Sequence, residues 1–340
     1  MEGINLLGSG KSFRTSKNKE LIRFGENKTS IEAKVIHKTL DNFIRLDIFE
    51  KGKKIYLNDK LARSTASLLQ LEPSITFSPA DHNIPEGEAA DRRSFLNKAL
   101  AILDWEYIEI YQQFTKVLTQ RNALIKKAST EESPLSTLVD SLEPWDAQFI
   151  HTSCELFWIR KQFIHNLNKV AEVEYQRISQ SKDVFHNIYQ PGCGQLICWQ
   201  SIKDKEELNE VFTSALKDSL RRDYFSGSTR IGPQRDEILL TLNGNEVKFY
   251  SSQGEKRTCA LALRLGELAL FRERFQKNPV LLFDDVSSEL DSYRRRALVD
   301  LLRKEDTQVF ITSTELPSAL IQETEKKFEH IELPALGESH

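Results

Sequence analysis

Two adjacent carboxylates offer the clearest chemistry in this chain of 340 residues. Asp284 and Asp285 directly follow the apolar run Val280-Leu281-Leu282-Phe283. A buried strand that ends in this way delivers its first carboxylate to the edge of a sheet, where the carboxylate can hold a hydrated Mg²⁺ beside the phosphates of a nucleotide. The second carboxylate can orient or deprotonate an attacking water. The alternative is a core strand that ends in a solvated turn, and this motif alone gives the two interpretations about equal weight.

A second motif lies upstream, at the start of a predicted helix. Apolar residues recur every three or four positions from Thr258 to Phe275, which indicates an amphipathic helix. Ser252 is a good N-cap, Gly254 lets the backbone come close to a ligand, and the first-turn N–H groups favour an anion such as a γ-phosphate. An ordinary capped helix explains this loop nearly as well. The order of the motifs favours nucleotide chemistry, because a capped loop, a helix, an apolar strand and paired aspartates follow one another. Asp284 lies 284 − 254 = 30 residues after Gly254.

The elements that must position these residues follow from the hydrophobic pattern. Alternating segments between Thr29 and Asn58 predict an antiparallel sheet. After Asp91 the periodicity is helical through about Ser181, with interruptions predicted near 129–134 and at Pro144. Further predicted elements are a strand and loop over 71–85, a strand at 195–200, a helix at 205–222, a hairpin of 236–242 and 246–249 around Asn243-Gly244, a strand at 280–283, a helix near 292–304, a strand at 308–312 and a closing strand near 328–333.

Composition limits the classes of protein to which this chain can belong. A hydrophobic content of 39 % over this length supports a sizeable core and suggests two lobes. No apolar run has membrane-spanning length and the amino terminus has no export pattern, so we expect a cytosolic protein with no membrane partner. The four cysteines lack paired spacing and predict neither a disulfide framework nor a zinc site. The net charge of −3 provides no global attraction to nucleic acid, so any DNA contact requires local basic patches.

Taken together, the motifs resemble those of the RecF family of DNA replication and repair proteins, whose heads are ATP-binding cassettes. Besides the two motifs above, the resemblance rests on Gly10-Lys11-Ser12-Phe13-Arg14-Thr15, Phe77-Ser78-Pro79, Arg92-Arg93-Ser94-Phe95-Leu96, Gln120-Arg121-Asn122-Ala123-Leu124, Pro144-Trp145-Asp146 and Gly232-Pro233-Gln234-Arg235-Asp236. Each segment is short, and their order over nearly the whole chain makes the match specific.

The resemblance implies an α/β fold: an ABC-type ATPase head of mixed sheet plus helices, with an inserted helical second lobe. Residues 1–91 would form the N-terminal part of lobe I, and residues 92–224 the helical lobe II. Residues 225–340 would complete lobe I with the Ser-x-Gly loop, the Walker B aspartates and the D-loop. The helical stretch lacks sustained heptads, which favours a compact RecF-like head over the long coiled-coil relatives.

The phosphate loop of such an ATPase is not found in the expected form. Gly10-Lys11-Ser12 matches the end of G-x-x-x-x-G-K-[ST], but the first glycine would fall at 10 − 5 = 5, which is Asn5. By resemblance, residues 2–7 correspond to the helix that follows the phosphate loop. We therefore expect this chain to lack the first strands and the phosphate loop of the family, which places ATP affinity and hydrolysis in question.

The resemblance also implies cofactors and site residues. ATP and Mg²⁺ would bind between two copies of the chain in an ATP-dependent homodimer. Asp284 would hold Mg²⁺ through water, Asp285 would act on the attacking water, and Thr314 would take the position of the γ-phosphate sensor. The γ-phosphate held by the other subunit would be covered by Ser252, Gln253, Gly254 and Glu255. Asp291 would lie at the dimer seam.

The basic candidates for DNA contact are Arg14, Lys17, Arg92, Arg93 and Arg121. The last three could equally brace the helical lobe.

The function implied is that of a weak ATPase that binds single-stranded or gapped duplex DNA, acts with recombination mediator proteins, and assists recombinase loading and SOS induction. One alternative is a truncated, non-catalytic head that serves as a binding module. A transporter ATPase subunit is less favoured, because the Arg-Arg-x-Phe-Leu and Gln-Arg-Asn segments are not expected there.

Overall fold

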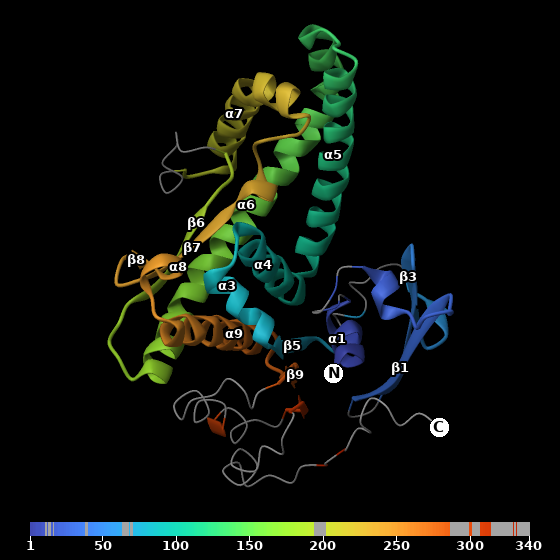
Figure 1. Ribbon diagram of the computed structural model, residues 1–340, viewed down its shortest axis with the longest axis vertical. Coiled ribbons are helices and arrows are strands. Elements are labelled where there is room, and N and C mark those ends of the chain that lie inside the picture. The colour runs from blue at the N-terminus through green and yellow to red at the C-terminus, as the bar shows by residue number, and fades with distance from the viewer. Residues whose placement is uncertain are drawn as a thin grey trace.

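Figure 1 shows the computed structural model of the chain. It describes residues 1–285 apart from 11, 13, 14, 16, 38, 39, 63–67, 69, 70 and 194–201, and beyond them residues 299, 300, 307–313, 329 and 331. The predicted helix near 292–304 and the predicted strands at 195–200 and 328–333 therefore lie wholly or largely outside the described residues.

The N-terminal part is an antiparallel sheet covered by a short helix. Strands β1 (Lys28–His37), β2 (Leu40–Phe49), β3 (Gly52–Leu57) and β4 (Lys60–Leu61) pair in that order. The sheet predicted between Thr29 and Asn58 is thus confirmed. Alternate residues of β2, Ile44, Leu46 and Ile48, are buried, as expected for a sheet with one covered face. They form a small core with Leu6 of α1 (Glu2–Ser9), while the 3₁₀ turn η1 (Asn18–Leu21) lies between α1 and β1.

A parallel sheet carries the apolar strand that precedes the two aspartates. Strand β9 (Val280–Phe283) lies between β5 (Ser74–Phe77) and β10 (Val309–Ile311), and both pairings are parallel. All four β9 residues are buried, which explains why the strand is apolar throughout and not alternating. The strands predicted at 280–283 and 308–312 are confirmed. Because the carboxyl ends of parallel strands meet at one edge, Ser78, Asp284 and Thr312 share that edge.

Long helices dominate the middle of the chain and extend away from the two sheets (Figure 1). They are α4 (Ala89–Leu103), α5 (Trp105–Thr130), α6 (Leu135–Ser179) and α7 (Lys205–Ser226). The break predicted near 129–134 is confirmed, but the interruption predicted at Pro144 is wrong, because this proline lies inside α6. Helix α6 packs against α5 and α9 (Gln253–Phe275), and this packing outweighs the hydrogen bond that proline removes.

A third sheet joins the helical part to the C-terminal segment. Strand β6 (Phe185–Gln190) pairs with β7 (Glu237–Leu242), which forms a hairpin with β8 (Asn245–Glu246). The turn at Asn243-Gly244 is confirmed, and both residues have positive φ, as a tight hairpin requires. The predicted extension of the second strand to Phe249 is wrong. Residues 247–250 form the helical turn α8 (Val247–Tyr250), which buries Val247 and leads the chain into α9.

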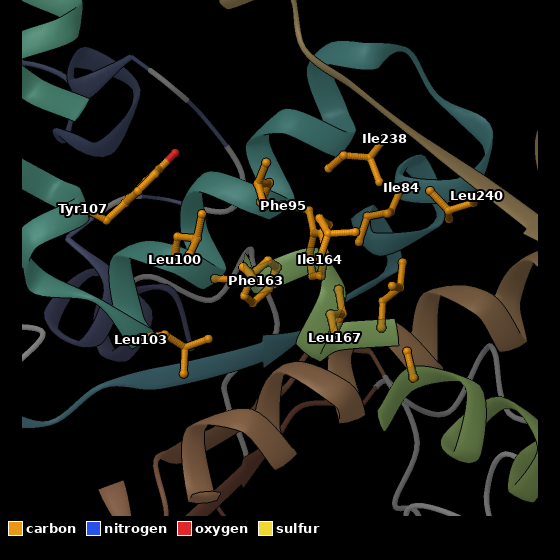
Figure 2. Close-up of a cluster of buried hydrophobic side chains, with 14 of the residues drawn as sticks. Ile84, Phe95, Leu100, Leu103, Tyr107, Phe163, Ile164, Leu167, Ile238 and Leu240 are labelled. Atoms are coloured by element: carbon orange, nitrogen blue, oxygen red, sulfur yellow. The ribbon is translucent and has the colours of Figure 1, made fainter. Parts of the chain in front are cut away.

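One large core connects the helices to the parallel sheet. Figure 2 shows its centre, where side chains of α4 and α6 meet Ile238 and Leu240 of β7. The cluster continues to Leu281 and Phe283 of β9, so the strand before the aspartates is anchored in it. Burial of each large side chain contributes about 1.5–3 kcal/mol. Short turns complete the described elements: η2 (Pro79–His82), α3 (Asn83–Glu86) and η3 (Pro233–Arg235).

Within the described part of the chain, no helix combines the length and the apolar character needed to cross a membrane.

Candidate functional site

The two aspartates lie at the edge of the parallel sheet, and a threonine from the neighbouring strand holds them. The Asp284 N–H donates to the Phe77 carbonyl at 2.8 Å, which continues the pairing with β5 by one residue. The Thr312 hydroxyl donates to Asp284 Oδ1 at 2.8 Å and accepts from the Asp285 N–H at 3.2 Å. The same hydroxyl therefore bridges the first carboxylate and the backbone of the second aspartate.

Asp285 has a backbone conformation that is uncommon for a residue other than glycine. Its φ is +53°, in the left-handed region that aspartate tolerates better than most residues. The chain therefore turns sharply directly after Asp284. The side chains of Asp284 and Asp285 are both half-buried.

The donor set at this edge suits a magnesium ion that is shared with phosphate. Mg²⁺ prefers carboxylate oxygens and usually takes one or two of them together with water and phosphate oxygens. Among the described residues there is no cluster of three or more His, Cys, Asp or Glu side chains that could hold a metal alone. Asp284 thus fits a magnesium ion held jointly with a phosphate ligand, and not a closed protein cage.

The Ser252 loop is the capped start of helix α9, as predicted. The Glu255 N–H donates to Ser252 Oγ at 3.3 Å, and the Ser252 N–H donates to Glu255 Oε2 at 2.6 Å, which completes a capping box. Ser252, Gln253 and Gly254 are exposed. The loop therefore presents the positive end of a 23-residue helix dipole to the solvent, where an anion would be favoured.

One chain does not bring the loop and the aspartates into a single site. Arg264, in the middle of α9, contacts Asp81, which lies in the turn that follows β5. Ser252 precedes Arg264 by 264 − 252 = 12 residues, or roughly 18 Å of helix. In Figure 1 the start of α9 lies beside α8, and the other end lies towards β5 and β9.

The residues that come before Gly10 in the phosphate-loop pattern are helical. Residues 5–9 belong to α1, and Gly10 ends this helix with a φ of +68°. The helix expected over residues 2–7 is confirmed. Gly8 allows α1 to approach β5 closely, since a Cβ at this position would lie 2.3 Å from Ser74 Oγ. Gly8 therefore serves packing in this structure.

The described arginines among the DNA candidates form hydrogen bonds inside the protein. Arg92 is buried and donates to both carboxylate oxygens of Glu237, at 2.7 and 2.8 Å. Arg93 is half-buried and donates to the Asp236 carbonyl at 2.8 Å. Lys17 is exposed and forms a 3.4 Å ion pair with Glu20. The remaining site residues predicted from the sequence, Arg14, Asp291 and Thr314, lie outside the described residues.

Arg121 is completely buried and joins three helices. It donates to Asp146 of α6 at 2.7 Å and to Asp223 of α7 at 3.0 Å, and its Nη1 also donates to the Thr229 hydroxyl. Burial raises the pKa of Asp146, and the charge of Arg121 opposes this shift. The segment Gln120-Arg121-Asn122 thus contains a buried polar connection between helices, and Asn122 accepts from the Thr229 N–H at 2.8 Å.

A second buried network, which the sequence did not reveal, involves the segment Gly232–Asp236. Arg160 of α6 donates to Asp236 Oδ2 at 2.6 Å and to the Pro233 carbonyl at 2.8 Å. Asp236 also accepts from the Tyr189 hydroxyl and the Gly192 N–H. Burial raises the pKa of Asp236, whereas Arg160 lowers it. Arg160 carried no sequence signal because it lies 76 residues from Asp236 in a regular helix.

Thr312 was also missed as a site residue. It is the last residue of the strand predicted at 308–312, and the parallel pairing of β10 with β9 places it beside Asp284. Its position at the end of a predicted strand was the one signal that could have indicated it.

Comparison with known proteins shows similarity along almost the whole chain. The model of the RecF/RecN/SMC N-terminal domain matches residues 1–329. The DNA replication and repair protein RecF of Bacillus cereus (strain B4264) is 32 % identical over 314 residues, which cover 92 % of this chain and 82 % of the relative. RecF of Bacillus thuringiensis (strain Al Hakam) matches with the same identity and coverage.

Two solved structures share the fold. They are the recombination mediator protein RecF-ATPrS in the RecFOR pathway, with a TM-score of 0.82, and RecF-ATP in the same pathway, with a TM-score of 0.83. Each is 31 % identical, and each match covers 93 % of this chain and 82 % of the solved one. The expected ATPase-head architecture of mixed sheets and helices agrees with these matches.

Proposed function

Because the chain belongs to the RecF/RecN/SMC N-terminal domain family, we propose that it is a RecF-like DNA replication and repair protein that binds DNA in an ATP-dependent way. It would act in the cytosol at single-strand gaps or gapped duplexes, and with recombination mediator proteins it would assist recombinase loading and SOS induction. The observation that carries this proposal is the pair Asp284 and Asp285 at the edge of the parallel sheet, held by Thr312. The division into lobes at 1–91, 92–224 and 225–340 is part of the same proposal.

Asp284 and Asp285 would perform different tasks. Asp284 would hold Mg²⁺ beside the ATP phosphates, and the ion would neutralise phosphate charge when bound. Asp285 would orient the attacking water or accept its proton. Thr312 fixes Oδ1 of Asp284, so this carboxylate would need little reordering when the ligands arrive.

The Ser252 loop would act on a nucleotide held by a second copy of the chain. Residues 252–254 are exposed, and the length of α9 separates them from the sheet edge that carries Asp284. These two observations support an arrangement in trans, in which the γ-phosphate is covered by Ser252, Gln253, Gly254 and Glu255. Asp291 at the dimer seam and Thr314 near the γ-phosphate complete this proposal.

DNA contact is assigned to the exposed basic residues first. Lys17 has a side chain available to phosphate, and Arg14 is proposed with it on the basis of the resemblance. The ion pairs of Arg92 and Arg121 support a bracing role for these two side chains.

The test compares the chain with its Asp285→Asn variant in three assays: ATP hydrolysis, sedimentation with and without ATP, and binding to gapped duplex DNA. We expect ATP-dependent dimerisation and DNA binding in both proteins, and a turnover at least about 100-fold lower in the variant. Glu273→Gln, a change at an exposed carboxylate of α9, is the matched control and should leave all three unchanged. If both ATP-dependent dimerisation and DNA binding are absent even after a phosphate loop is restored upstream of residue 1, the proposal is overturned.

A second candidate is a binding module without nucleotide turnover. It is favoured because the residues before Gly10-Lys11-Ser12 form helix α1, so residues 5–9 do not form a phosphate loop. This hypothesis expects DNA binding that is the same with and without ATP. A measurable turnover that disappears in Asp285→Asn excludes it.

A further inference from the structure

The N-terminal sheet carries a concentration of basic side chains at one of its ends. Residues 17–28 and 47–54, all of which the structure describes, contain seven Lys or Arg and four Asp or Glu residues. Their formal charge is 7 − 4 = +3, in a chain whose net charge is −3. We call these two segments the basic end of the sheet, and their exposed cations are Lys17, Lys19, Arg23, Lys28, Lys51 and Lys54.

Strand pairing and hydrogen bonds bring the two segments together. The first residue of β1 pairs with the last residue of β2, so the start of β1 lies beside the turn that leads into β3. The Asn18 side chain donates to the Gly52 carbonyl at 3.4 Å, and the Thr29 hydroxyl donates to the Leu21 carbonyl at 2.7 Å. The η1 turn is thus tied to the strands at this end, and the cations of both segments lie close together.

One aromatic side chain projects from the basic end. Phe24 is fully exposed (103 %), and it is the one exposed apolar side chain within residues 17–28 and 47–54. It lies in a turn in which the Glu26 N–H donates to the Arg23 carbonyl at 3.0 Å and Gly25 has a φ of +86°. The turn therefore holds the ring in solvent between Arg23 and, four residues further on, Lys28.

Exposed cations around one exposed ring suit a single-stranded nucleic acid. Cations bind the phosphates of any strand, and an aromatic ring stacks on an unpaired base whatever its identity. The bases of a duplex are stacked on each other and closed to such a ring. A protein partner would instead favour a contiguous apolar patch. The other apolar side chains of both segments are buried or half-buried: Leu21, Ile22, Ile48 and Phe49.

We propose that the basic end binds single-stranded DNA, with Phe24 stacked on one unpaired base and the surrounding cations on the flanking phosphates. The choice of DNA among polyanions rests on the proposed function, whereas the surface itself belongs to one chain and requires no nucleotide. Only an unpaired base can stack on the ring, so Phe24 distinguishes the single-stranded part of a gapped duplex from its paired parts. The surface thus gives a chain of net negative charge a preference for the gap.

The test measures binding of a short oligothymidylate by fluorescence anisotropy, with 2-aminopurine at one position as a reporter of stacking. Phe24→Ala should weaken binding by about 5- to 100-fold, as the loss of one stacked base predicts, whereas Phe24→Trp should bind at least as tightly as the parent. The parent should quench the 2-aminopurine emission and Phe24→Ala should not. Because Phe24 is fully exposed, the Tm of Phe24→Ala and its binding to a duplex of the same length should remain those of the parent.

Ile36→Ala is the matched control for the ring. Ile36 is also exposed (71 %) and lies on β1, about 26 Å along the strand from Lys28, so its single-strand binding should equal that of the parent. Lys51→Gln tests the cations and should weaken binding and reduce the slope of log affinity against log salt by about 0.7. Lys34→Gln, at an exposed lysine farther along β1, should do neither.

Three outcomes overturn this inference. They are equal single-strand affinity of the parent and Phe24→Ala, an equal loss on single strand and duplex in that variant, and binding to vesicles of anionic lipid that requires Phe24 while single-strand binding does not. If binding to gapped duplex persists in these cases, the proposed function stands. A parent chain that binds no DNA also overturns the inference, and the assay with a restored phosphate loop then decides the proposed function.

Discussion

Single arginine residues in this chain show how strongly the surroundings decide the role of a side chain. Arg92, Arg121 and Arg160 are buried, and each is paired with a carboxylate from another part of the chain. A buried ion pair gives little net stability relative to apolar residues, but removal of one partner leaves an uncompensated buried charge. These arginines should therefore behave in mutagenesis as structural residues.

Replacing Arg121 tests this expectation directly. Arg121→Met leaves Asp146 and Asp223 without their cation, so we expect the free energy of unfolding to fall by about 3–5 kcal/mol in urea titrations. Arg222→Met, a change at an exposed position of α7, should stay within about 0.5 kcal/mol of the parent. If Arg121→Met kept full stability while DNA affinity fell, the side chain would have a DNA role instead.

Glu267 should make stability depend on pH. Burial raises the pKa of this carboxyl above its ordinary value of 4.5, although Arg264 opposes the shift. The folded state thus keeps a proton that the unfolded state releases, and the contribution of this group to stability falls as the pH rises from about 4.5 towards the folded pKa. One proton corresponds to a slope of at most about 1.4 kcal/mol per pH unit.

In Glu267→Gln this slope should disappear, so the stability of the parent minus that of the variant should decrease as the pH rises through this window. Urea titrations at several pH values measure the difference, with Glu273→Gln as the exposed control on the same helix. Parallel pH profiles for the parent and Glu267→Gln would contradict the assignment.

At the scale of elements, helix α1 depends on one glycine for its position against β5. An alanine Cβ at Gly8 would lie 2.3 Å from Ser74 Oγ and 2.9 Å from the Ser74 backbone nitrogen. We expect Gly8→Ala to lose about 1–3 kcal/mol of stability despite its better helix propensity. Ser74→Gly should recover part of this loss in the double variant, because it removes Ser74 Oγ and Cβ, the two nearest atoms at 2.3 and 2.6 Å.

Gly3 offers the control within the same helix. Its nearest contact for an added Cβ is Ile31 Cγ2 at 3.6 Å, an ordinary packing distance. Gly3→Ala should therefore leave stability unchanged or raise it by up to about 1 kcal/mol. Thermal unfolding of the two single variants and of Gly8→Ala with Ser74→Gly checks the series, and equal Tm values for Gly3→Ala and Gly8→Ala would exclude the close contact.

Helix α9 should depend on its cap. Ser252→Ala removes the acceptor for the Glu255 N–H and should cost about 1 kcal/mol, whereas Ser252→Asn keeps a capping oxygen and should cost only a few tenths. Urea unfolding distinguishes the two variants. Equal stability of both would show that the capping box contributes nothing measurable.

For the whole molecule, the buried residues divide into unequal cores. The N-terminal sheet and α1 share a small cluster, whereas the helices, β7, α9 and β9 share a large one. Fewer buried contacts permit opening at a lower free energy. We expect the amides of β2 to exchange through local opening at a lower free energy than those of β9, as native-state hydrogen exchange can measure. Equal opening free energies for both strands would indicate a single cooperative unit.

The sequence by itself determined the elements whose signals are local. The structure forms four elements of this kind: the strand of the apolar run before Asp284, the cap at Ser252, the Asn243-Gly244 turn and the strands that alternate between Thr29 and Asn58. Each of their patterns can be recognised over a few consecutive residues. Backbone geometry and side-chain periodicity act over this range, so a pattern of residue types is enough to predict them.

Only the tertiary structure decided which distant groups meet. Arg92 and Glu237 are 145 residues apart, Arg121 and Asp223 are 102 apart, and Thr312 reaches Asp284 across 28. The conversion of residues 247–250 into a helical turn and the continuity of α6 through Pro144 likewise depend on packing. Ion pairs, hydrogen bonds and burial depend on separation in space, and the sequence of this chain encodes that separation only through the complete fold.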